Sequence, residues 1–212
     1  MKKIFFALAA FVAVSCFNRD GKKNVSEATI SSLDSTPKNY VDSQRELENQ
    51  STVVNYDSLG ELISKIRFDV TTDNLEDYED GKIPWIRIDS PQIDLKNLIG
   101  EDEIVIPETK LTVIIDYPLS SSCKFELISP TGFTRAQVIN EISKHYYQLY
   151  DEEEKTATIK TIPLKERKIF NRNRTNGKYG IWGHDIGDLV LDEVHVYKNS
   201  IGEVFLTLQI ES

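Results

Sequence analysis

The residues best suited to chemistry in this sequence are concentrated in one short segment, residues 176–188. The segment contains four glycines, two aromatic residues, His184 and the carboxylates of Asp185 and Asp188. Glycine permits positive φ and close backbone approach, so such a segment can hold polar side chains in a confined space. A histidine beside carboxylates suits two kinds of chemistry: binding of a metal such as zinc or iron, and acid–base catalysis.

Three interpretations of His184, Asp185 and Asp188 are open from the sequence. A metal site needs further ligands, and the other histidines, His145 and His195, are isolated in the sequence, so neither a metal nor another cofactor is predicted. Acid–base catalysis needs a nucleophile or a substrate cleft, and the sequence shows neither. The favoured interpretation is structural: His184 bonds a backbone carbonyl, and one of the aspartates caps a turn.

A binding role for the same segment would use Lys178, Tyr179 and Trp182, a cation and two aromatic side chains. Loops carried on a rigid scaffold are where binding groups concentrate. The structural alternative places Trp182 in the core. The sequence contains no P-loop, no dinucleotide-binding glycine pattern, no H-E-x-x-H zinc motif, no G-x-S-x-G nucleophile motif and no EF-hand loop. The catalytic candidates therefore have no motif to support them.

The element that precedes the segment is predicted to be one long amphipathic helix over residues of about 134–155. Thr134 and Gln137 have the spacing of a capping box. Apolar residues then recur at helical intervals, at Val138, Ile139, Ile142, Tyr146 and Leu149. We expect this stripe to pack on one face of a sheet.

The predicted helix ends in four consecutive acidic residues, 151–154. Anions are disfavoured at a helix C-terminus because of the helix dipole. Either the helix continues past them or they point into solvent, and a solvated face is favoured over a cation site. A loop rich in Lys, Arg and Asn follows at residues 165–178.

The rest of the chain is predicted to be mostly β-strand. Short strand-like stretches occur at residues 83–88, 103–106, 110–117 and 124–128. Alternating residues at 189–197 and 204–210 predict a C-terminal hairpin, and a change of phase at Asp192 and Glu193 predicts a β-bulge. The predicted fold class is α+β: a mostly antiparallel sheet with the long helix on one face.

The N-terminal part of this domain is predicted to be a short amphipathic helix over residues 58–67. Ser58 and Glu61 have capping-box spacing, and apolar residues follow at helical intervals. We expect a single globular α+β domain over residues 51–212, which is long enough to bury a core.

The first residues have the layout of a secretory signal peptide, predicted for residues 1–15. Lys2 and Lys3 precede an apolar run over residues 4–14, which is too short to span a bilayer core of about 30 Å. The following Ser15-Cys16 resembles the lipobox of bacterial lipoprotein precursors, although position 13 is alanine where leucine is usual. The resemblance implies cleavage before Cys16, acylation of its thiol with chains such as palmitate, and anchoring of the protein to a membrane of the cell envelope.

Residues 16–50 are predicted to be a disordered lipoprotein tether, because they are rich in Ser, Asn, Asp, Lys and Glu and have no apolar period. The chain carries a net charge of −9, and loss of Lys2 and Lys3 with the leader makes it −11. Such an acidic protein gains nothing from counterion release, so a nucleic-acid partner is excluded. With Cys16 acylated, Cys123 has no disulfide partner in the chain and is interpreted as a half-buried strand residue.

A second resemblance covers residues of about 125–195. An F-T-x-x-Q helix start at 133–137, a Y-x-x-Y-x-E-E-E helix end and a G-I-W-G-H-D-x-x-D-L-x-L segment at 180–191 resemble a family of uncharacterised proteins. The resemblance implies a shared fold module and no activity.

These observations predict a membrane-anchored, exported lipoprotein that acts as a non-enzymatic binding module. Its expected partners are the membrane, through the lipid on Cys16, and an envelope protein; the sequence does not indicate an oligomeric state. The alternative is a small hydrolase or metal-dependent enzyme that uses residues 180–188.

Overall fold

The computed structural model describes residues 54–212. The predicted signal peptide (1–15), the predicted acylation site Cys16 and the predicted tether (16–50) lie outside the described residues. Within the described part of the chain, no helix combines the length and the apolar character needed to cross a membrane.

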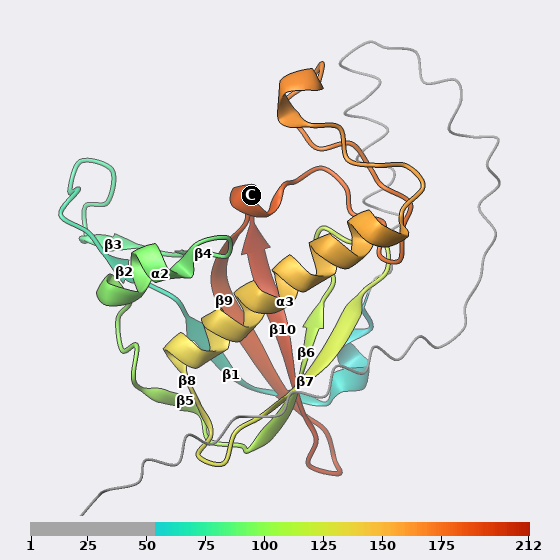
Figure 1. Cartoon of the computed structure of the whole chain (residues 1–212). Helices are drawn as coiled ribbons and strands as arrows, with labels where there is room; N and C mark the ends of the chain where they lie inside the picture. Colours follow the sequence, from blue (N-terminus) through green and yellow to red (C-terminus); the bar gives the residue numbers. More distant parts are fainter. Residues whose placement is uncertain (1–53) are drawn as a thin grey trace, which may run out of the picture.

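The main feature is a twisted six-stranded sheet (Figure 1). Five strands follow the order β1-β9-β10-β6-β7, and β4 pairs with β9 beside this path. The bounds are β1 Glu61–Arg67, β4 Ile86–Arg87, β6 Lys110–Ile115, β7 Cys123–Ile128, β9 Val190–Lys198 and β10 Val204–Glu211. All pairs are antiparallel except β10 with β6. The mixed α and β content and the mostly antiparallel sheet expected from the sequence are confirmed.

The hairpin of β9 and β10 forms the centre of this sheet and confirms the predicted C-terminal hairpin. Val204 pairs with Lys198 at its turn end. The register slips where Gln209 pairs with Glu193 and Ile210 pairs with Leu191, which leaves Asp192 as an extra residue. This is the predicted bulge, and the Asp192 carbonyl accepts a hydrogen bond from the Phe68 backbone instead.

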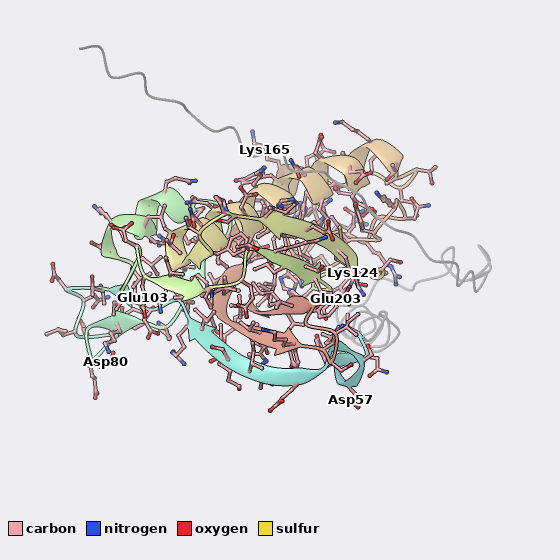
Figure 2. The ribbon with its side chains drawn as sticks, turned by 90° about the horizontal axis from the view of Figure 1, so that it is seen from below. Asp57, Asp80, Glu103, Lys124, Lys165 and Glu203 are labelled. Carbon is pink, nitrogen blue, oxygen red and sulfur yellow. The ribbon has the colours of Figure 1, made fainter. Side chains whose placement is uncertain are left out.

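Helix α3 (Arg135–Thr156) crosses one face of the sheet. Its N-terminus is closed by a capping box in which Thr134 accepts from the Gln137 N–H and Gln137 accepts from the Thr134 N–H. The side chains that it buries are Val138, Ile139, Ile142, Ser143, His145, Tyr146, Leu149 and Glu153. When the molecule is seen from below, α3 lies along one side of the strands and β1 lies at the opposite edge (Figure 2).

The helix predicted at residues 58–67 is wrong. A 3₁₀ turn, η2 (Tyr56–Leu59), is followed by Gly60 with φ of 100° and then by edge strand β1. Ser58 closes that turn by donating to the Asn55 carbonyl, instead of capping a helix. Pairing with β9 overrides the local helical pattern, because a strand beside β9 gains a full ladder of backbone hydrogen bonds.

Smaller elements cover the ends of the sheet. They are β2 (Val70–Thr71), β3 (Lys82–Ile83), α2 (Pro91–Asp94), η3 (Leu95–Asn97), β5 (Ile104–Ile106) and β8 (Phe133–Thr134). The strand predicted at 83–88 is therefore split, with Pro84 between its two pieces. Two further 3₁₀ turns are η4 (Leu164–Glu166), which precedes the glycine-rich segment, and η5 (Ile186–Asp188), which forms the end of that segment.

Candidate functional site

The glycine-rich segment is a buried corner between α3 and the sheet. Tyr179, Ile181 and Trp182 are all buried, and Ile181 forms a β-bridge with Leu119. Gly180 has a φ of 65°, and a Cβ there would lie 2.9 Å from the Ser120 hydroxyl. Only glycine meets both requirements, which gives a packing reason for its presence.

The acidic end of α3 binds this corner. Glu153 is fully buried, with 0% of its surface exposed. Its Oε1 accepts from the Thr175 hydroxyl (2.6 Å) and the Gly177 N–H (2.7 Å). Its Oε2 accepts from the N–H groups of Tyr179 (2.7 Å) and Gly180 (3.2 Å). Burial raises the pKa of this carboxyl, but the four hydrogen bonds outweigh burial and hold the pKa below its usual value.

The neighbouring carboxylates, Glu152 and Glu154, bind the same region. Glu152 accepts from the Lys178 ammonium (2.8 Å) and the Tyr179 hydroxyl (2.6 Å), which lowers its pKa. Glu154 Oε2 accepts from the Thr161 hydroxyl at 3.0 Å. The expectation of a solvated acidic face is therefore wrong for Glu153. The helix dipole does not disfavour these anions decisively, because each one receives hydrogen bonds from the chain that follows.

Asp185, a catalytic candidate, is the acceptor for two arginines. Arg167 forms a two-pronged ion pair with it, at 2.6 Å to Oδ2 and 3.0 Å to Oδ1, and Arg172 Nη1 lies 3.4 Å from Oδ1. Burial raises the pKa of Asp185, but the two guanidinium groups lower it by more. The Arg172 guanidinium also lies over the ring of Tyr150, at 5.0 Å from the centroid.

Asp188 closes the turn η5. Its Oδ2 accepts the backbone N–H of Asp185 at 2.8 Å, and its own N–H donates to the Asp185 carbonyl. A carboxylate placed in this way fixes the start of a helical turn. Asp188 thus orients the backbone that presents the Asp185 carboxylate to the arginines.

His184 lies beside aromatic rings instead of facing the two aspartates. Its ring centroid is 5.6 Å from that of Tyr117 and 6.1 Å from that of Trp182. Its Nε2 lies 3.4 Å from the Ser212 hydroxyl, and its backbone carbonyl accepts from the Tyr150 hydroxyl at 2.9 Å. The backbone N–H of His184 donates to the Trp182 carbonyl at 2.8 Å, and a bond from the His184 ring to a backbone carbonyl stays a prediction.

The other two histidines lie elsewhere. His145 is buried in α3, where its ring stacks on Phe125 at 3.5 Å and burial lowers its pKa. His195 is half-buried on β9, with its Nε2 2.6 Å from Glu193 Oε1. Cys123 is buried in β7, with its Sγ 3.8 Å from the Tyr179 hydroxyl. Over residues 54–212, no three His, Cys, Asp or Glu side chains come together as a group able to hold a metal ion.

The contacts of Asp185 with Arg167 and Arg172 hold a loop that projects from the body of the protein. We call residues 158–173 the projecting loop; it contains η4 and is the orange segment that stands away from the sheet in Figure 1. Arg167 ties its two limbs together by donating to the Ile162 carbonyl (2.7 Å) and the Phe170 carbonyl (3.3 Å). The loop is therefore braced at its centre by the arginine that also binds Asp185.

Two asparagines brace the base of the projecting loop. The Asn173 side chain accepts from the Ile162 N–H (2.7 Å) and donates to the Lys160 carbonyl (3.1 Å). The Asn176 side chain accepts from the N–H groups of Thr158 (3.0 Å) and Ile159 (2.7 Å). These bonds satisfy backbone groups that lack a secondary-structure partner, so the loop has a defined shape.

The outer surface of the projecting loop is apolar and basic. Phe170 is 72% exposed and Leu164 is 54% exposed, and Ile162 and Ile169 are exposed beside them. Lys165 and Lys168 are exposed between these side chains. Residues 158–173 hold five basic residues and one acidic residue, a net charge of +4 in a chain of net charge −9.

Sequence reasoning found the glycine-rich segment but missed the residues that bind it. Glu153, Arg167 and Arg172 carry the site, and none of them was singled out. The available signal was an acidic run followed at short distance by a basic loop. Such complementary charges on consecutive elements indicate mutual binding, which the interpretation as a solvated face overlooked.

Comparison of this chain with protein-family models, with curated proteins and with solved structures finds no match in any of the three. The resemblance of residues 125–195 to a family and the resemblance of Cys16 to a lipobox stay predictions.

Proposed function

We propose that this protein is an exported bacterial lipoprotein, anchored to a cell-envelope membrane through lipid on Cys16, and that it works as a non-enzymatic binding module. The proposed location is supported by the N-terminal sequence, which contains two lysines, an apolar run and Ser15-Cys16. Two or three acyl chains would anchor the protein durably, because each buried methylene contributes roughly 0.8 kcal/mol.

In this proposal the binding surface is the projecting loop, and α3 is the amphipathic platform that carries it. The observation that supports this most strongly is the position of Asp185. This residue, one of the three catalytic candidates, binds Arg167 and Arg172, and Arg167 in turn spans the two limbs of the loop. A carboxylate held by two arginines is a poor general base, since its pKa is lowered.

The exposed side chains of the loop support binding for a second reason. Isolated apolar residues at a surface are ordinary, but a group of them on one projecting segment marks an interaction site. Taking about 200 Å² for each fully exposed side chain, the four apolar residues of the loop present roughly 400 Å². A patch of this size is within the range at which exposed apolar surface is often functional.

The proposed lipid anchor on Cys16 is tested by labelling the protein with palmitate in a bacterial host. The full chain, grown with labelled palmitate, should take up label and fractionate with membranes. The Cys16→Ala variant should lose the label, and Cys123→Ala should keep it. Label that persists without Cys16, or that never appears, contradicts the proposed address.

The binding surface is tested by photo-crosslinking in cells. A photoreactive residue at Phe170 should give adducts with envelope components, and the same residue at Ile201, which is 78% exposed on the β9–β10 turn, should give none. Equal adducts from the two positions would show that exposure alone drives the reaction. Stoichiometric metal bound to the purified chain and lost in His184→Ala would instead favour the enzymatic alternative.

A further inference from the structure

We infer that the projecting loop is a membrane-docking element that inserts its apolar side chains into the surface of an anionic phospholipid bilayer. The inference rests on the proposed function in one respect: it identifies the partner of the proposed binding surface. It concerns a second membrane contact, made by the folded domain itself beside the proposed acyl anchor.

The first support is the chemistry of the outer surface of the loop. Phe170 and Leu164 are its most exposed apolar side chains, and Lys165 and Lys168 are exposed beside them. At a bilayer surface, apolar side chains enter the boundary between headgroups and acyl chains, and lysines pair with anionic headgroups. Lys165 lies on the α3 side of the molecule, away from Asp57 at the far edge (Figure 2).

The second support is the contrast in charge. The exposed charges of the loop are those of Lys160, Lys165, Lys168 and Glu166, a net +2, whereas the chain as a whole carries −9. Arg167 and Arg172 are excluded from this sum because their side chains are only 6% and 7% exposed and bind Asp185. An anionic bilayer repels the body of such a protein and attracts only its basic segment, so the loop is the part that can approach. Glu166 is the one acidic residue of the loop, and the nearby Asp185 already binds Arg167 and Arg172.

The third support is the size of the patch, which distinguishes a membrane from a protein partner. A stable protein interface buries roughly 800 Å² on each side, about twice what the four apolar side chains of the loop offer. A bilayer contact can be smaller when a second anchor holds the protein nearby. The predicted tether of 35 residues would span about 30–35 Å, so it keeps the loop at high effective concentration near the membrane.

The fourth support is the bracing of the loop. Arg167 joins its limbs at Ile162 and Phe170, and Asn173 closes its base. The apolar side chains are therefore presented outward without a large loss of chain entropy on binding. Residues that only connected two elements would not require this number of side-chain bonds to the backbone.

The test uses the chain from residue 17 onward, which lacks the acylation site and keeps every described residue. It is mixed with sedimenting vesicles of phosphatidylcholine alone or with added phosphatidylglycerol. We expect binding to the anionic vesicles only. Removing two surface lysines, Lys165→Ser with Lys168→Ser, should lower the partition coefficient roughly 30-fold, at about fivefold for each lysine.

The apolar contact is tested separately by Leu164→Ser with Phe170→Ser, which should lower partition about tenfold or more. The matched controls are Ile201→Ser for the apolar change and Lys124→Ser with Lys82→Ser for the charge change; all three residues are exposed and lie outside the loop. These controls should bind as the parent chain does. Phe170→Trp should shift its fluorescence to the blue on anionic vesicles, and Ile201→Trp should not.

Several outcomes would overturn the inference. The first three are equal binding to neutral and anionic vesicles, no binding to either, and equal losses of binding in the loop variants and the control variants. The fourth is stronger displacement from vesicles by inorganic phosphate than by chloride at equal ionic strength, which would indicate a phosphate-binding site. A saturating crosslink from Phe170 to an envelope protein, without vesicle binding, would assign the loop to a protein partner. None of these outcomes affects palmitate labelling of Cys16. The proposed lipid anchor and the inferred membrane-docking loop can therefore be contradicted separately.

Discussion

Two carboxylates, Glu153 and Asp185, bind consecutive parts of the chain after α3 by different physical means. Glu153 binds residues 175–180 of the buried corner, and Asp185 binds two arginines of the projecting loop. Glu153 is fully buried and receives four hydrogen bonds from neutral groups, three of them backbone N–H groups. Asp185 keeps 35% of its side chain exposed and is bound by two guanidinium groups. Both have a pKa below the usual value, although burial opposes this in each.

The difference indicates which part of the chain after α3 is held rigidly and which part can adjust its position. A buried charge is stable only while all its hydrogen bonds are made, because water cannot replace a lost partner. A half-exposed ion pair is screened by salt and can be solvated when it opens. Glu153 therefore sets the fold of the corner, and Asp185 sets the position of the projecting loop upon it.

The largest effect is expected from Glu153→Ala. The substitution removes the acceptor of two buried N–H groups, those of Tyr179 and Gly180, and of the partly buried Gly177 N–H. The Thr175 hydroxyl keeps the Ile181 carbonyl at 3.2 Å, and each unsatisfied buried group costs about 1–3 kcal/mol. We expect a loss of about 3–5 kcal/mol in the free energy of unfolding, measured by urea denaturation. Glu152→Ala, on the same turn but half-exposed, should cost less than about 1.5 kcal/mol. Equal losses in the two variants would show that Glu153 has no special position.

A smaller effect is expected from Asp185→Asn. The amide keeps the shape of the side chain but removes the negative charge that Arg167 and Arg172 bind at this position. We expect a loss of about 1–2 kcal/mol at low salt, reduced at high salt because the pair is partly exposed. Denaturation in two salt concentrations separates it from Glu153→Ala, whose loss should not depend on salt. A salt-independent loss for Asp185→Asn would remove the proposed contrast.

The two carboxylates should also appear in the acid limb of the stability profile. Because both have a lowered pKa in the folded protein, they stabilise it above their unfolded values of about 4.3 and 3.9. This stabilisation is lost as the pH falls through each folded pKa. The difference in stability between the parent chain and Glu153→Gln should thus shrink steadily below about pH 4.3. A difference that stays constant down to low pH would mean that Glu153 is protonated in the folded state.

The smallest effect is expected from Asn173→Ala at the base of the projecting loop. Its lost bonds to Ile162 and Lys160 are exposed, so water replaces them, and we expect at most about 0.5–1 kcal/mol. Amide hydrogen exchange at residues 160–162 should nonetheless rise, since their brace is gone. Unchanged exchange there would show that Arg167 alone holds the loop.

The sequence predicts those elements whose signals are local. The ends of the β9–β10 hairpin, and even its bulge at Asp192, follow from alternation and a change of phase within the hairpin itself. Residues 58–67 carry an equally regular helical pattern and form strand β1 instead. Their conformation is decided by β9, more than a hundred residues away, which no local pattern records.

The candidate site shows the same division. The composition of residues 176–188 marks the segment as unusual, and the burial of Tyr179 and Trp182 agrees with its aromatic content. The sequence could not show that His184 lies beside Tyr117, which is far from it in the sequence. It could not show either that Asp185 binds Arg167 and Arg172. Each of these contacts depends on how α3 and the loop fold back on one another.

The sequence by itself determined the acidic charge, the C-terminal hairpin and the place of the glycine-rich segment, and it carries the pattern from which a leader is predicted. These properties depend on composition and short-range periodicity, which are present before the chain folds. Only the tertiary structure decided the roles of the charged residues. A carboxylate becomes a solvated group, a catalyst or a structural anchor according to which donors surround it, and the donors around Glu153 and Asp185 are brought there by the fold.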